Sequence, residues 1–116
     1  MEERRRFKRF NISLKSVLTF SDDDSSGLNA EVRDFSREGV RVQIPQSLTC
    51  DAETPVKIQA YLPGEHLPII FGAKTKWIRC NNNVCEIGCH LEAITAQDRN
   101  QILDYAYNRW RETVLA

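Results

Sequence analysis

The chain is dominated by short segments in which apolar residues recur at every second position, the period of a β-strand with one buried face. Ile12, Leu14, Leu18 and Phe20 show this spacing, and turn-forming residues separate the segments. Six strands are predicted: Ile12 to Phe20, Leu28 to Arg33, Val40 to Ile44, Val56 to Leu62, Ile69 to Cys80 and Val84 to Leu91. Because no helix-length crossover separates them, the pattern predicts a small antiparallel β-barrel rather than a parallel sheet.

The period changes near the C-terminus. Thr95 followed by Asp98 resembles a capping box, and Ile102, Ala106 and Trp110 then recur at helical spacing. This pattern predicts a helix whose apolar stripe, which includes Ile102 and Trp110, packs on the barrel or on a partner. The predicted domain is therefore mainly all-β and has three parts: a flexible basic arm at residues 1–10, a barrel at 11–94 and a C-terminal helix at 95–116.

The first ten residues concentrate positive charge. They contain Arg4, Arg5, Arg6, Lys8 and Arg9 against two glutamates, so they carry +3 while the rest of the formally neutral chain carries −3. A basic cluster on an otherwise acidic body indicates a local anion site and argues against a binder of duplex DNA or RNA. Guanidinium groups pair bidentately with phosphate or with the O6 and N7 edge of guanine. A solvated, frayed chain end is the alternative interpretation.

A second motif, Asp34-Phe35-Ser36-Arg37-Glu38-Gly39, joins the second and third predicted strands. These residues are suited to a turn, because aspartate and serine side chains bond to nearby backbone and glycine tolerates unusual backbone angles. An Asx-type turn that merely connects two strands is therefore one interpretation of the segment.

The 116 residues suffice for one domain with a core that needs no metal or disulfide. No apolar run approaches the length of a membrane span, and no apolar signal segment follows the charged start, so a cytoplasmic location is expected. The cysteines, Cys50, Cys80, Cys85 and Cys89, show no C-x-x-C spacing and are predicted to be reduced. On a strand, His90 would point away from Cys85 and Cys89, which argues against a metal site.

The sequence contains no recognisable set of catalytic residues. His66 and His90 are the only histidines, and Ser36 lies beside Asp34 without a base to activate it. The chain is therefore interpreted as a binding module that is neither an enzyme nor dependent on a cofactor.

Three signatures occur in an order that resembles the PilZ family of cyclic di-GMP (c-di-GMP) receptors: R-x-x-x-R at Arg5 and Arg9, D-x-S-x-x-G at Asp34, Ser36 and Gly39, and a later Gly88 opening a strand. The resemblance covers most of the chain. It implies a six-stranded antiparallel barrel with a C-terminal helix, in agreement with the strand and helix pattern. It also implies that c-di-GMP is the ligand.

The resemblance implies a role for each signature residue. Arg5 and Arg9 would clamp the guanines and phosphates from the N-terminal arm. Asp34 would accept from N1 and N2 of guanine, an edge that adenine does not present. Ser36 would offer its hydroxyl to the ligand or to the turn, and Gly39 would permit a positive φ or a close approach.

Five further residues are candidates for the ligand site. In the family, a basic residue at the position of Arg4 is associated with an intercalated ligand dimer, which predicts two ligands per domain. Arg6, Arg37, Arg41 and Gly88 are possible additional contacts. Arg37 and Arg41 are alternatively outward-facing strand charges.

The resemblance implies that the arm closes over the ligand and that the altered surface signals to an unidentified protein partner. Two alternatives remain. One is an interaction adaptor of the same fold that does not bind c-di-GMP. The other is a barrel that binds single-stranded nucleic acid through Lys74, Lys76, Trp77 and Arg79. It is disfavoured because Trp77 or its neighbours are expected to pack inward.

Overall fold

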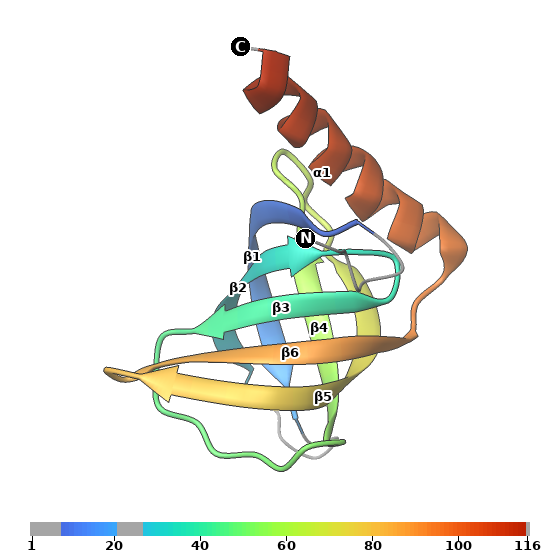
Figure 1. Ribbon diagram of the computed structural model, residues 1–116. Coiled ribbons are helices and arrows are strands. Elements are labelled where there is room, and N and C mark those ends of the chain that lie inside the picture. Colours follow the sequence, from blue (N-terminus) through green and yellow to red (C-terminus); the bar gives the residue numbers. More distant parts are fainter. Residues whose placement is uncertain (1–7, 21–26, 116) are drawn as a thin grey trace.

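The computed structural model describes residues 8–20 and 27–115 of the chain. Its strands are β1 (Phe10–Thr19), β2 (Leu28–Phe35), β3 (Gly39–Ile44), β4 (Pro55–Tyr61), β5 (Ile69–Asn81) and β6 (Val84–Ala93), and its helix is α1 (Ala96–Leu115). The strands close into a barrel in the order β1-β2-β3-β6-β5-β4, and every neighbouring pair is antiparallel (Figure 1). The predicted fold class is confirmed.

Alternation along the strands fills the barrel interior. In β3, Val40, Val42 and Ile44 are buried, whereas the residues between them face outward and are half-buried. Phe35 and Phe71 meet edge to face across the core, with ring centroids 6.1 Å apart. Each such buried side chain contributes roughly 1.5–3 kcal/mol of transfer free energy, so the alternating pattern both selects the strand conformation and stabilises the closed barrel.

A tight turn connects β5 to β6. Asn82 and Asn83 both have positive φ, 55° and 64°, as a two-residue hairpin turn of type I′ requires. This turn places Cys80 opposite Cys85, with their Cα atoms 4.0 Å apart, and the two form a disulfide. The prediction of four reduced cysteines is therefore wrong for this pair. Spacing along the sequence did not reveal the pairing, because the hairpin register creates it.

Helix α1 packs against one end of the barrel and its C-terminal half projects beyond it (Figure 1). The Thr95 hydroxyl accepts a hydrogen bond from the Asp98 amide at 3.0 Å, as predicted for the cap. Ile102 and Ala106 are buried in the core, whereas Trp110 is 39% exposed. Ile102 and Ala106 of the predicted apolar stripe thus pack in the core, and Trp110 packs on Phe10 of β1 while part of its ring stays exposed. Within the described residues, no helix is apolar enough over a sufficient length to cross a membrane.

Candidate ligand-binding site

The strand register assembles a line of residues across the outer face of the barrel. Asp34 of β2 lies opposite Arg41 of β3, Arg41 lies opposite Gly88 of β6, and Gly88 lies opposite Trp77 of β5. On the other side of Asp34 the line continues to Asn11 of β1. We call Asn11, Asp34, Arg41, Gly88 and Trp77 the outer row. It joins residues from five strands, so the pairing of these strands brings them together.

The N-terminal arm enters the barrel beside this row. Arg9 is followed by Phe10, the first residue of β1, and then by Asn11. Phe10 packs edge to face with Tyr107 and Trp110 of α1, with ring centroids 6.4 Å away in each case. The start of β1 therefore packs against α1. The other predicted arm residues, Arg4, Arg5 and Arg6, lie outside the described residues.

Asp34 is largely buried, and Arg41 compensates its charge. The residue is 8% exposed, and its Oδ2 accepts a hydrogen bond from Nε of Arg41 at 2.6 Å. This bond raises the pKa of Arg41, so the guanidinium stays charged. A partly desolvated carboxylate needs such a partner. Asp34 and Arg41 thus form one polar cluster on the outer row.

Ser36 and Gly39 shape the turn between β2 and β3. The Ser36 hydroxyl accepts hydrogen bonds from the amides of Gly39 at 3.1 Å and Glu38 at 3.4 Å. A Cβ on Gly39 would lie 3.3 Å from the carbonyl oxygen of Cys89, so a close approach explains this glycine. Gly39 is not among the residues with positive φ. Ser36 thus bonds within the turn, Gly39 allows the close approach of β6, and the Asp34 carboxylate pairs with Arg41 across the strands.

Gly88 lies within β6, whereas the sequence predicted that it opens a strand. The Trp77 ring packs directly on this glycine. A Cβ on Gly88 would lie 2.2 Å from Cε2 of Trp77, so only glycine lets the indole lie this close. Trp77 is 38% exposed, and a register shift between Thr75 and Trp77 accompanies its outward position. Trp77 therefore does not pack inward, whereas its neighbour Thr75 is buried.

Sequence reasoning did not include Trp77 in the ligand site. A signal was available, because a glycine in a strand interior often marks a close approach. The identity of the group that approaches Gly88 depends on the β5–β6 register, however, and the bulge in β5 changes that register.

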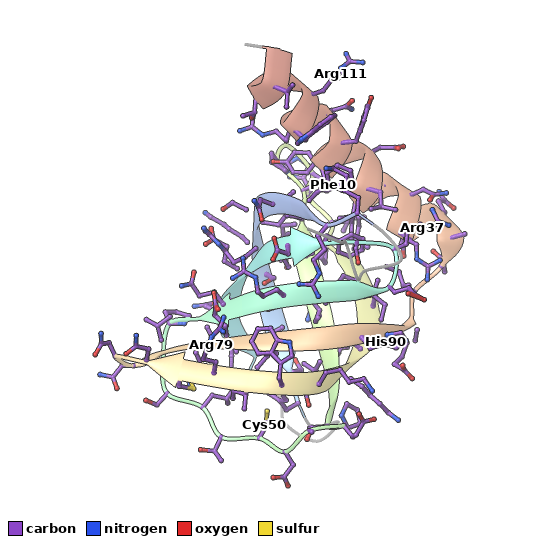
Figure 2. The ribbon with its side chains drawn as sticks, viewed as in Figure 1. Phe10, Arg37, Cys50, Arg79, His90 and Arg111 are labelled. Carbon is purple, nitrogen blue, oxygen red and sulfur yellow. A yellow bond between two sulfur atoms is a disulfide. The ribbon has the colours of Figure 1, made fainter. Side chains whose placement is uncertain are left out.

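A network of charges extends from the outer row to the next row of outward-facing residues. Glu86 accepts from Nη1 of Arg41 at 2.5 Å and from Nη2 of Arg79 at 3.0 Å. The guanidinium of Arg79 also lies 5.2 Å from the Trp77 ring centroid. In Figure 2, Arg79 lies towards the β5–β6 hairpin, whereas Arg37 lies at the β2–β3 turn beside α1. Arg41 is thus part of the network around the row.

The two remaining cysteines face a different environment. Burial raises the pKa of Cys89 to about 12, and burial also raises the pKa of Cys50. Cys85 and Cys89 point inward while His90 is exposed, as the strand alternation predicted. Among residues 8–20 and 27–115, no group of three or more histidine, cysteine or acidic side chains is arranged to hold a metal ion.

Several solved structures share this fold. The inhibitor of motility of Bacillus subtilis (MotI/DgrA) has a TM-score of 0.78 and 17% sequence identity, and the match covers 96% of this chain and 53% of that one. The PilZ domain of YcgR from Escherichia coli, solved with c-di-GMP, has a TM-score of 0.74 and 16% identity, and the match covers 96% and 95%. The chain therefore spans about half of the Bacillus protein.

A third structure, the MrkH–c-di-GMP complex of K. pneumonia, has a TM-score of 0.72 at 12% identity, over 97% of this chain and 54% of that one. Identities this low establish a common fold alone. No match was found among curated proteins. The family model of the PilZ domain, by contrast, matches residues 3–108, which include the R-x-x-x-R and D-x-S-x-x-G signatures and Gly88. The chain therefore belongs to the PilZ domain family.

Proposed function

We propose that the domain is a non-catalytic receptor that binds c-di-GMP between the N-terminal arginine arm and the outer row. One observation carries the proposal: the β1–β2 register places Asn11, where the arm enters the barrel, directly beside Asp34. The family match supports it, as do two structural neighbours that are c-di-GMP complexes.

The chemistry of these residues suits the ligand. Arg5 and Arg9 supply guanidinium forks for the phosphates and the guanine O6 and N7 edge. Asp34 accepts from N1 and N2 of guanine, which selects guanine over adenine. Trp77 is 38% exposed and offers its indole for base stacking beside Arg79, and Gly88 leaves room for that indole against the sheet.

The remaining predicted contacts concern the number of ligands. We propose that Arg4 favours an intercalated pair of c-di-GMP molecules and that Arg6 and Arg41 add phosphate contacts. Arg37 is exposed at the β2–β3 turn and is a further candidate for a contact with the second molecule.

The proposed output is an order change of the arm, which neutralisation of its charges by the phosphates would stabilise. Phe10 follows the arm and contacts Tyr107 and Trp110 of α1. Movement of the arm would therefore alter the surface of α1 and signal to a separate protein in the cytoplasm.

Isothermal titration tests the proposal. The purified domain is titrated with c-di-GMP, with GTP and cyclic di-AMP as ligand controls, and Arg9→Ala and Asp34→Ala are compared with Glu53→Gln. The control removes the charge of Glu53, which lies between β3 and β4 and forms an exposed ion pair with Lys76, outside the outer row. We expect c-di-GMP binding that is selective, unchanged in the control and weakened by about 1–3 kcal/mol in each site variant. Two ligands per chain would support the role of Arg4, and one would reject it.

The alternative function is an interaction adaptor of the same fold. Tyr107, Trp110 and Val114 are exposed on α1, 45%, 39% and 57%, and they form a surface that a protein partner can cover. The adaptor is favoured if neither the domain nor its variants release or absorb heat with c-di-GMP at high concentration. A salt-sensitive gel shift with single-stranded oligonucleotides would instead favour the nucleic-acid alternative.

A further inference from the structure

Glu86 bridges two arginines directly beside the outer row. Its Oε2 is 2.5 Å from Nη1 of Arg41, and its Oε1 is 3.0 Å from Nη2 of Arg79. Glu86 lies opposite Arg79 in the β5–β6 register and two residues before Gly88, so all these side chains share the outer face. The Glu86 side chain is 22% exposed, which leaves it accessible to displacement.

A phosphate binds a pair of arginines in the same way as this carboxylate, with two of its oxygens each accepting from one guanidinium. The two arginines are suited to exchange partners. Arg41 binds Asp34 through Nε and Glu86 through Nη1, so the bond to Asp34 anchors the guanidinium when the second partner changes. Arg79 is 71% exposed in its side chain and is held over Trp77, where an anion can reach it from solvent.

The charges of this cluster cancel. Asp34 and Glu86 balance Arg41 and Arg79, so the cluster has no net attraction for an anion while all four groups are ionised. An anion can bind both guanidinium groups only if it displaces a carboxylate. Asp34 is largely buried and bound to the anchored Nε, whereas Glu86 is more exposed. Glu86 is therefore the group to be displaced.

We infer that Glu86 is an internal competitor for the ligand phosphate, a residue that occupies Arg41 and Arg79 in the free protein and thereby lowers the affinity of the site for c-di-GMP. The inference rests on the proposed function and adds a residue that determines its affinity. Glu86 holds the two arginines in the free protein and turns to solvent when a phosphate replaces it.

Titration of Glu86→Gln with c-di-GMP tests the inference. Glutamine keeps the shape of the side chain but removes the charge that competes with phosphate. We expect about tenfold tighter binding, the effect of one charge-assisted hydrogen bond, and no gain in the matched control Glu53→Gln. The gain should disappear in the double variant Glu86→Gln/Arg79→Gln. Equal or weaker binding by Glu86→Gln, in a protein that binds c-di-GMP, would overturn the inference and leave the proposed function intact.

A second measurement distinguishes a failure of the competition by Glu86 from a failure of the proposed c-di-GMP binding. The side-chain Nε–H signals of Arg41 and Arg79 are followed by NMR while inorganic phosphate is added to the wild type and to Glu86→Gln. We expect both signals to move at a lower phosphate concentration in the variant. If they do so while c-di-GMP fails to bind either protein, the competition holds and the proposed function fails. Signals that do not move, or that move equally in both proteins, overturn the competition.

Discussion

Gly88 and Trp77 meet across β5 and β6 in a contact that leaves no room for a methyl group. In Gly88→Ala the new Cβ would lie 2.2 Å from the indole, so the ring has to leave its place on the sheet. We expect the free energy of unfolding to fall by about 1–3 kcal/mol, with a change in tryptophan fluorescence. Urea denaturation followed by fluorescence and circular dichroism measures both effects.

The control is a double-mutant cycle with Trp77→Ala. Once the indole is absent, the methyl group that Gly88→Ala adds displaces no ring and creates no clash, so the substitution should cost less than about 0.5 kcal/mol in that background. An equal cost with and without Trp77 would show that Gly88 is required for a reason unrelated to the ring.

The two cysteines outside the disulfide should react slowly in the folded protein. With a pKa of about 12, Cys89 has roughly one thiolate in ten thousand molecules at pH 8, and the thiolate is the reactive form. We expect iodoacetamide to modify Cys50 before Cys89, and both rates to keep rising above pH 9, because each pKa is raised above the ordinary value of 9.0. Mass spectrometry after timed alkylation measures the order. Rapid modification of native Cys89 near neutral pH would contradict its burial.

At the scale of single residues, the sequence predicted Asp34, Ser36 and Gly39 because a short motif contains them all. It did not predict that Arg41 pairs with Asp34 or that Glu86 holds Arg41, since these residues meet only through the pairing of β3 with β2 and β6. Ser36 and Gly39 have a structural role in the turn, which their motif positions left open.

Among the elements, α1 is joined to the barrel by Ile102 and Ala106 in the core and by Tyr107 and Trp110 against Phe10 of β1. Ile102 is fully buried, and Ile102→Ala should lower the free energy of unfolding by about 2–5 kcal/mol by leaving a cavity. Val114→Ala, in the exposed last turn, is the matched control and should change stability by less than about 0.5 kcal/mol. Chemical denaturation of both variants provides the comparison, and equal effects would contradict the way α1 packs.

The elements themselves were largely predictable. Period-two alternation located all six strands, and the Thr95 cap located the start of α1, because burial on one face acts locally on the sequence. The bulge before Trp77 was not predictable, since it depends on how β5 pairs with β6. The Cys80–Cys85 disulfide was not predicted for the same reason, because the Asn82–Asn83 turn determines which residues face each other.

Across the whole molecule, the pairing of β1, β2, β3, β6 and β5 brings distant sequence motifs onto one surface. The arm enters at the start of β1, the D-x-S-x-x-G motif ends β2, and Gly88 and Trp77 come from β6 and β5 (Figure 1). The sequence indicated that the two motifs belong together only through a family resemblance. Their physical proximity follows from the antiparallel β1–β2 pairing, which places Asn11 beside Asp34.

An NMR titration of the ¹⁵N-labelled domain with c-di-GMP shows whether the ligand binds on this surface. We expect the largest chemical-shift changes at residues 9–11 and 34–41 and at the Trp77 indole and Gly88, with smaller changes in α1 around Tyr107 and Trp110. Changes confined to another face of the barrel, or none at saturating ligand, would contradict it.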